Sequence, residues 1–146
     1  MALKVELKPN ERIIIGDSLV TNCGPRTRIV IEGSSPILRE KDIMTAAAAD
    51  TPAKRIYLAI QLMYTSKDAS IHHELYFKLV RDMVQAAPST WRYFEFINNH
   101  ILTGDLYKAL KEAKKLIAYE QELFANAKRR PSLQDRIAAD VQSPRA

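Results

Sequence analysis

Apolar and polar residues alternate in short runs over the first 45 residues, which is the pattern of strands with one buried face. Within residues 3–8, leucine and valine alternate with lysine and glutamate. Further short runs, apolar or β-branched, follow at 12–15, 18–21, 27–32 and 37–39. Proline, glycine, asparagine and aspartate stand between these runs and favour turns. The pattern therefore predicts a small antiparallel sheet.

After residue 50 the apolar residues recur every three or four positions, which indicates amphipathic helices. Asp50 and Thr51 are capping candidates, and Pro52 suits the first position of a helix. We expect four helices, at about 52–66, 71–87, 89–103 and 106–127. The residues expected to begin or end the later helices are Ser70, Pro88, Ser89, Gly104 and Asp105.

Each predicted helix has an apolar stripe that should face a common core. The stripes comprise Ile56, Ile60 and Met63 in the first helix, Tyr76, Leu79, Val80, Met83 and Val84 in the second, Trp91, Phe94, Ile97 and Ile101 in the third, and Leu106, Leu110, Ala113, Ile117 and Phe124 in the fourth. Four such helices on short loops favour a helical bundle.

The predicted fold class is therefore α+β, with a small antiparallel β domain at residues 1–48 and a four-helix bundle at 49–130. Residues 131–146 form a polar tail that we expect to be disordered. A β part of about 45 residues cannot bury a core alone. It must pack on the helices or on a second copy of the chain, and the second arrangement would make a homodimer.

The composition is that of an ordinary globular protein, with 47% hydrophobic and 27% charged residues among 146. No apolar run approaches the roughly 18 residues needed to cross a bilayer. Cys23 is the only cysteine, so an intramolecular disulfide and cysteine-rich zinc sites are excluded. We expect a cytoplasmic protein without a membrane segment.

Candidate catalytic residues are few. His72 and His73 are adjacent, so they point about 100° apart on a helix and cannot chelate one metal ion as an i, i+4 pair would. Cys23 has no local histidine partner, and no acidic pair is singled out for general acid and base catalysis. We expect a protein that is not an enzyme and that has neither a metal site nor a cofactor.

Basic residues exceed acidic ones by 22 to 17, but residues 1–50 carry seven of each and are neutral overall. On the fourth helix, Lys108, Lys111 and Lys115 fall within an arc of about 60°. They form either a phosphate-binding ridge or an ordinary solvated face. On the third helix Tyr93 and Phe96 lie beside the apolar stripe, so they could line a groove for another protein.

Four segments together resemble the FlbT family of flagellum biosynthesis repressors of alphaproteobacteria. They are GPRTRIVIEG at 24–33, PILREKDIM at 36–44, ADTPAKRIYLAIQLMY at 49–64 and INNHILTGDLYKALKEAKKLIAYEQEL at 97–123. The resemblance implies a cytoplasmic, non-enzymatic regulator that associates with the 5′ untranslated region of flagellin mRNA and lowers its translation or lifetime. It also implies the flagellar protein FlaF as a partner. Some members of the family are said to act positively.

The β part also resembles the small CsrA RNA-binding proteins, through LKPNERIIIGD at 7–17 and RIVIEGSSPILREKDI at 28–43. In that family the strands of a homodimer intertwine, and an arginine at the end of the last strand contacts an RNA loop. That arginine falls on Arg39 here, followed by Glu40 as the family pattern requires.

Several positions depart from the CsrA pattern. Leu38 stands where that family has histidine, and Asn10 replaces the glycine before Glu11. The stretch between the two quoted segments is several residues shorter. The basic contact of the first strand falls near Leu7 or Lys8.

The leading hypothesis is that Arg39, Arg26, Arg28 and Lys41 bind a single-stranded loop of the flagellin leader, so that ribosomes are blocked or nucleases gain access. The alternative is an adaptor or chaperone-like module whose helices bind FlaF or flagellin through Tyr93 and Phe96, with indirect effects on the mRNA. The neutral charge of the β part favours the alternative.

Overall fold

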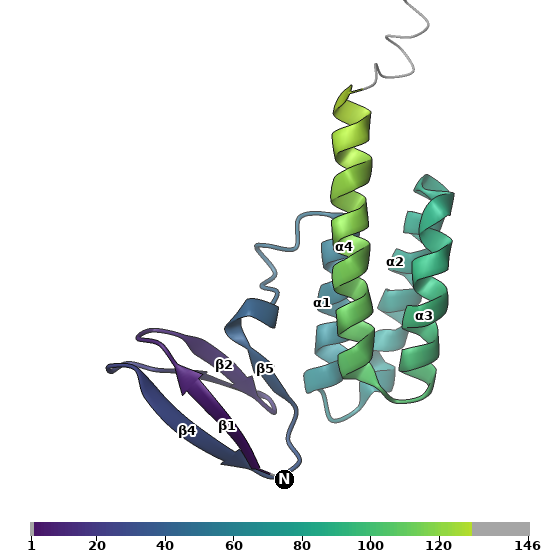
Figure 1. The fold of residues 1–146 in the computed structure, drawn as a ribbon. Helices are drawn as coiled ribbons and strands as arrows, with labels where there is room; N and C mark the ends of the chain where they lie inside the picture. Colours follow the sequence, from purple (N-terminus) through teal and green to yellow (C-terminus); the bar gives the residue numbers. More distant parts are fainter. Residues whose placement is uncertain (1, 130–146) are drawn as a thin grey trace, which may run out of the picture.

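The computed structural model describes residues 2–129, where five strands precede four α-helices (Figure 1). The strands are β1 (Ala2–Leu7), β2 (Arg12–Ile15), β3 (Ser18–Thr21), β4 (Thr27–Glu32) and β5 (Ile37–Arg39). The strands β2 to β5 coincide with predicted runs, β1 lies one residue before the predicted run at 3–8, and all pairings are antiparallel. The predicted α+β class is confirmed. The predicted tail at 131–146 lies outside the described residues.

The strands form two thin layers that bury a common apolar interior. One layer pairs β1 with β4, and the other has the strand order β3-β2-β5. Val5 and Leu7 of the first layer and Ile13 of the second are almost completely buried, and four isoleucines pack around them: Ile15, Ile29, Ile31 and Ile37. The apolar residues of the alternating sequence pattern thus form this small interior.

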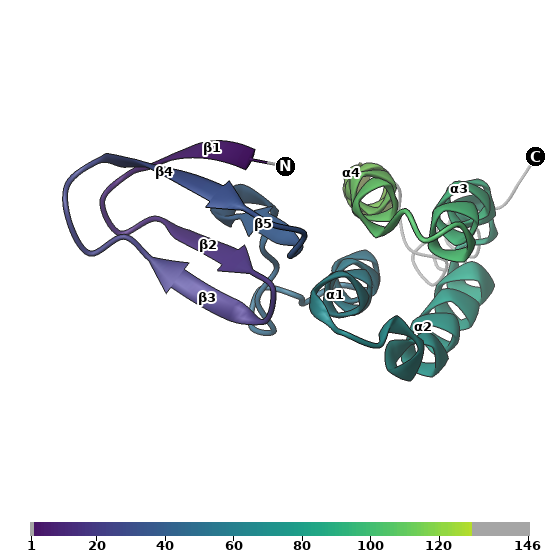
Figure 2. The ribbon, with the colours of Figure 1, turned by 90° about the horizontal axis from the view of Figure 1, so that it is seen from below.

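The four α-helices are α1 (Pro52–Thr65), α2 (His73–Ala86), α3 (Trp91–Leu102) and α4 (Leu106–Arg129), and short 3₁₀ turns cover Glu40–Asp42, Ala69–His72 and Pro88–Thr90. Viewed along the bundle, α1 and α4 lie next to the β layers, while α2 and α3 lie on the far side (Figure 2). Helix α1 packs on both α2 and α4, and α4 packs on α3. The helices therefore enclose one core, in which α1 and α4 each pack on two neighbouring helices.

Local signals set several helix ends as predicted. The Thr51 hydroxyl accepts a hydrogen bond of 3.3 Å from the Lys54 N–H, and Pro52 is the first residue of α1. Gly104 has φ +79° just after α3, a left-handed conformation that glycine adopts without strain. Asp105 caps α4 by accepting from the Lys108 N–H at 3.3 Å. These predictions are confirmed.

The predicted caps at Ser70 and Ser89 are wrong. Both serines lie inside 3₁₀ turns that precede their helices, and no side chain caps α2 or α3. Asp68 instead accepts from the Ser70 N–H at 3.1 Å and begins the first of these turns. A 3₁₀ turn at the start of a helix offers its N–H groups to partners other than the expected cap. A cap prediction based on a single serine therefore placed the start of each helix about two residues too early.

The apolar stripes are confirmed for most positions, with two exceptions. Trp91 is 51% exposed, because it is the first residue of α3 and lies about 60° around the helix from the buried Phe94. Phe124 is 44% exposed, because the last turns of the long helix α4 project beyond its neighbours (Figure 1). Leu116, which lies between two predicted stripe positions of α4, is fully buried.

The β part packs on the helices, which was one of the two arrangements expected. Leu38 of β5 is buried in the helical core, and Ile14 of β2 packs against it. The Gln61 amide group accepts from the Met44 N–H at 2.7 Å and donates to the Met44 carbonyl at 3.0 Å. The Tyr57 hydroxyl donates to the Asp42 carbonyl. The β part and the helices therefore share one set of buried residues. The division of the chain into two domains between residues 48 and 49 remains a prediction.

Candidate nucleic-acid interface

The end of β5 carries two of the predicted RNA-binding residues. Arg39 is the last residue of the strand and pairs in register with Ile13, and Lys41 follows in the 3₁₀ turn. Alternation along β5 directs Leu38 into the helical core, so Arg39 lies on the opposite side, with Ile37. Both cations are exposed, and within residues 2–129 neither forms an ion pair.

These cations face a hollow of about 610 Å³ that we call the turn-side hollow. Its other wall is the β1–β2 turn, from Lys8 to Glu11. Asn10 has φ +66° in this turn, a conformation that asparagine tolerates better than most residues and glycine better still. The substitution of glycine by Asn10 in the CsrA pattern therefore preserves the turn.

Lys8 joins Arg39 and Lys41 in the turn-side hollow, whereas Leu7 is buried between the β layers. The resemblance had placed a basic contact at one of these two neighbours, and the structure leaves only Lys8 available to a ligand. Glu40, also in the hollow, is held by Arg12 at 3.2 Å. Of the cations that line this hollow, none is neutralised by an ion pair within the described residues.

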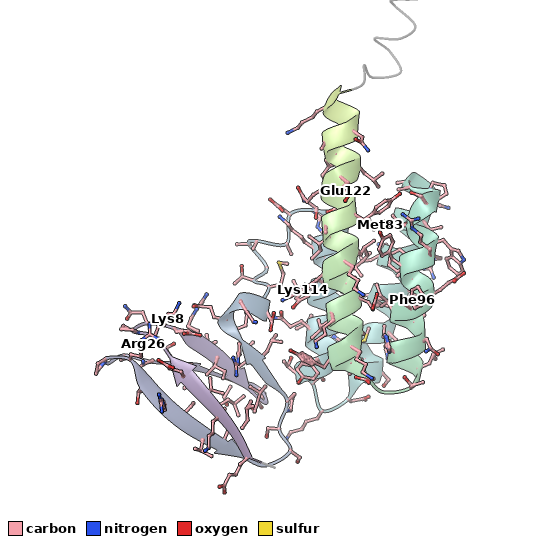
Figure 3. All side chains as sticks on the ribbon, in the orientation of Figure 1. Lys8, Arg26, Met83, Phe96, Lys114 and Glu122 are labelled. Atoms are coloured by element: carbon pink, nitrogen blue, oxygen red, sulfur yellow. The ribbon has the colours of Figure 1, made fainter. Side chains whose placement is uncertain are left out.

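Arg26 and Arg28 are placed differently. Arg26 lies at the same end of the β part as Lys8 (Figure 3), but its guanidinium donates to the Glu6 carboxylate at 2.8 Å. This hydrogen bond lowers the pKa of Glu6. Arg28 lies opposite Glu6 across the β1–β4 ladder, on the outward face beside Lys4. Among the residues that line the turn-side hollow, neither arginine appears.

A second hollow, of about 470 Å³, lies where the β layers meet the helices, and we call it the junction hollow. Arg39 and Lys41 line it as well, so they separate it from the turn-side hollow. Its helical wall contains Tyr64 of α1 and Tyr107 of α4. Sequence reasoning missed both tyrosines, because only the docking of the β part on the bundle brings them beside β5.

The lysines of α4 do not form one ridge. Lys108 pairs with Asp105 at 3.4 Å, Lys115 pairs with Glu112 at 3.0 Å, and Lys114 pairs with Asp42 of the 3₁₀ turn. Lys111 is different, because its ammonium group lies 5.0 Å from the centre of the Tyr107 ring. The solvated-face interpretation therefore suits Lys108 and Lys115, while Lys111 and Lys114 belong to the junction with the β part.

The two residues predicted to bind a protein partner differ in exposure. Tyr93 is half-buried and packs on Tyr119, with 5.0 Å between the ring centres and 30° between their planes, and Arg92 lies over both rings. Phe96 is 60% exposed on the outer side of α3 (Figure 3). Trp91, which was predicted to be buried, adds a second exposed aromatic ring to this helix.

Within residues 2–129, no three histidine, cysteine, aspartate or glutamate side chains gather closely enough to hold a metal ion. Cys23 is exposed and unpaired by any disulfide there. No helix of this part of the chain is both long and apolar enough to cross a bilayer.

Residues 3–124 match a protein family described as "Flagellar protein FlbT". The chain is 61% identical over 124 residues to the probable flagellum biosynthesis repressor protein FlbT 1 of Bradyrhizobium diazoefficiens, covering 84% of this chain and 85% of that protein. It is 50% identical to a probable flagellum biosynthesis repressor protein FlbT of Rhodopseudomonas palustris, covering 86% and 99% of the two chains. The flagellum biosynthesis repressor protein FlbT of Caulobacter vibrioides is 34% identical, with 84% and 89% covered. No solved structure matches the chain.

Proposed function

The chain belongs to the FlbT family, and from this premise we propose that it represses flagellum biosynthesis by binding the 5′ untranslated region of flagellin mRNA. Bound protein would block ribosomes or expose the message to nucleases, without breaking a bond itself. It would act in the cytoplasm, as a regulator that is not an enzyme and needs no cofactor. The names of the curated relatives support the repression, and the geometry of the β part supports the RNA contact.

One observation carries the RNA contact. Lys8, Arg39 and Lys41 line one hollow at the end of β5 together with Glu11 and Glu40, and none of the three cations forms an ion pair within the described residues. Cations of this kind hold phosphates, and an arginine can also donate two hydrogen bonds to the edge of an exposed base. Single-stranded loops present such bases, whereas the deep major groove of an RNA duplex hides them.

Arg26 and Arg28 take a supporting part in this proposal. The Arg26–Glu6 ion pair is exposed on both sides, and such pairs contribute little to stability because water screens them. An incoming phosphate could therefore replace the Glu6 carboxylate at small cost. Arg28, on the outward face of β4, would reach only a longer RNA that wraps around the β part.

The test is a titration of purified protein into labelled flagellin leader RNA across a series of salt concentrations. Arg39→Ala should weaken binding, and it should lower the slope of log K against log salt by about 0.7, the value for one phosphate contact on a single strand. Arg81→Ala, at an exposed arginine of α2 remote from the hollow, is the matched control and should bind as the unchanged protein does.

Two results would contradict the proposal. The first is no binding to the leader, and the second is equal binding to an unrelated RNA of the same length. Circular dichroism of each variant separates loss of binding from loss of folding. Light scattering of the free protein, measured beforehand, gives the number of chains that bind each RNA.

A homodimer belongs to the same proposal. Within the described residues, β3 pairs only with β2, and β4 pairs only with β1. Each of these strands therefore keeps an unpaired edge, which is a template for pairing with another chain. Two copies would place two arginines at position 39 within one assembly and could bind a leader at two points.

A second function is favoured by a different observation. Phe96 and Trp91 are more than half exposed on α3, on the side of the bundle away from the β part. Exposed aromatic residues of this kind commonly anchor a partner protein. The alternative proposal is an adaptor that binds FlaF or flagellin through α3 and alters the mRNA indirectly. Tyr93, already covered by Tyr119 and Arg92, would contribute less to this surface.

A further inference from the structure

The junction hollow has an aromatic wall that the sequence did not reveal. The rings of Tyr64 and Tyr107 stack with 6.0 Å between their centres and 23° between their planes. The Tyr64 hydroxyl donates to the Ile37 carbonyl at 3.3 Å, which fixes that ring against β5. Tyr107 is 41% exposed, so part of its surface remains open to a ligand.

Cations surround this aromatic wall. Arg39 and Lys41 line the junction hollow, and a smaller adjoining cavity of about 220 Å³ adds Lys111 and Lys114. Asp42 is the one carboxylate among the residues that line the two cavities, and its partner is Lys114. Four cations and one carboxylate leave a net charge of +3 around two stacked tyrosines.

From this arrangement we infer that the junction hollow binds an unstacked nucleobase of single-stranded RNA, held against Tyr107 with its phosphates on Lys41 and Lys111. Proteins that bind single strands combine an aromatic platform with cations that follow the backbone in this way. The volume of about 470 Å³ also lies within the roughly 300–1,000 Å³ range of pockets for small ligands. The inference rests on the proposed RNA binding and extends it to residues of α1 and α4.

The position of Lys111 suggests how the site opens. Its ammonium group lies over the Tyr107 ring at 5.0 Å, where an exposed cation–π contact contributes little to stability. A phosphate would attract this flexible side chain away from the ring, and the vacated face would be available to a base. The hydroxyl groups of Ser34 and Ser35, which also line the hollow, can donate to or accept from the edge of that base.

The two hollows also form one route. Because Arg39 and Lys41 line both, an RNA strand that contacts Arg39 beside the β1–β2 turn passes directly into the junction hollow. One nucleotide of a loop would then lie on Tyr107 while its neighbours lie beside Lys8 and Arg39. The RNA site would thus be composite, with phosphate contacts from the β part and a stacking platform from the helices.

Tyr107→Leu tests the platform, because leucine keeps an apolar surface and removes the stacking ring. Binding of the labelled flagellin leader, and of a labelled uridine dodecamer, should weaken about 5- to 150-fold. Tyr107→Phe should bind within about twofold of the unchanged protein. Phe124→Leu is the matched control, since Phe124 is similarly exposed on the same helix but far from the hollow, and it should have no effect.

Lys111→Ala provides a second variant that leaves the Tyr64–Tyr107 stack in place, and Lys108→Ala is its control on the same helix. The first should weaken binding and reduce its salt dependence, and the second should not. A leader series in which each base is removed in turn gives a direct readout. The unchanged protein should be sensitive to the loss of one particular base, and Tyr107→Leu should lose that sensitivity.

The outcomes separate this inference from the proposed function. If neither RNA binds the unchanged protein, both fail. If Arg39→Ala weakens binding but the Tyr107 and Lys111 variants bind normally, the proposed function survives and the nucleobase site is overturned. If Tyr107→Leu releases FlaF and leaves RNA binding intact, the hollow is a protein site and the inference fails.

Discussion

Two buried tyrosines each connect two elements of the fold through one hydrogen bond from the hydroxyl group. Tyr57 of α1 donates to the Asp42 carbonyl beside β5, and Tyr76 of α2 donates to Oδ1 of Asn98 on α3 at 2.6 Å. Both side chains are almost completely buried, and burial disfavours the charged phenolate. It therefore raises the pKa of both tyrosines well above the ordinary value near 10.

These raised pKa values predict a loss of stability in alkali. Above pH 10 an unfolded tyrosine releases its proton while the folded one keeps it, so the unfolded state binds fewer protons and the free energy of unfolding falls as the pH rises. Each residue contributes about 1.4 kcal/mol per pH unit in this range. Urea unfolding at several pH values between 8 and 11.5 measures the decline.

Tyr76→Phe isolates one of these two contributions. The variant should be less stable at pH 8, because it loses the hydrogen bond to Asn98, but its stability should decline less steeply above pH 10. The difference between the two curves removes the titration of lysines, which both proteins share. Identical slopes would show that Tyr76 does not couple folding to pH.

At the scale of secondary structure, α4 holds the first turn of α1. Glu120 is 2% exposed, and its Oε2 accepts from the Ala53 N–H at 2.9 Å, one of the N–H groups that a helix leaves without a partner in its own first turn. A carboxylate at this end also interacts favourably with the helix dipole. Oε1 of Glu120 has no hydrogen-bond partner within the described residues.

Glu120→Ala should therefore lower the free energy of unfolding by about 1–3 kcal/mol, because the Ala53 N–H stays buried without an acceptor. Glu120→Gln keeps an acceptor oxygen and should cost less. Urea unfolding measures both. Glu122→Ala, at an exposed site two residues away (Figure 3), should change stability by no more than about 0.5 kcal/mol. Equal stability of Glu120→Ala and the unchanged protein would contradict this account.

Helices and strands were predictable where the signal lies within a few residues. The cap at Thr51, Pro52 in the first turn and Gly104 after α3 each act on their own backbone, so the sequence alone indicated them. The contact between Glu120 and Ala53 spans 67 residues, and no local pattern announces it. The predicted start of α3 was also wrong, because the 3₁₀ turn Pro88–Thr90 precedes the helix, which begins at Trp91.

At the scale of the whole molecule, the two faces proposed for RNA and for a protein partner are separate. The cations of the hollows lie between the β part and helices α1 and α4, whereas Phe96 and Trp91 lie on α3, on the far side of the bundle (Figure 2). One protein could therefore bind a message and a partner at the same time. Variants on one face should leave the other function unchanged.

Phe96→Glu tests this separation. If α3 binds FlaF, co-purification of the two proteins should be lost, because a charge replaces an apolar anchor at an exposed site where folding tolerates it. Binding of the flagellin leader should stay within about twofold of the unchanged protein. Phe77→Glu, at an exposed aromatic residue of α2, is the matched control. A FlaF complex that survives Phe96→Glu would exclude this surface.

The order of the elements, their types and the faces that they bury followed from the sequence by itself, because alternation and helical periodicity are properties of neighbouring residues. Arg39 was also identified from the sequence, through the resemblance of residues 28–43 to the CsrA pattern. Leu38 illustrates what the sequence left open. It departs from the histidine of the CsrA pattern, and the departure has a physical reason only in the folded chain, where α1 covers this side of β5 and requires an apolar residue.

Only the tertiary structure decided which residues of these elements lie together at the proposed site. The packing of the β part on α1 and α4 brought Tyr64 and Tyr107 together with Arg39, although the sequence separates them by 25 residues or more. It also gave the lysines of α4 different partners. Lys111 lies over the Tyr107 ring, whereas Lys114 and Lys115 form ion pairs. Such contacts depend on the shape and charge of the whole fold. Both are fixed only when the β part and the helices pack together.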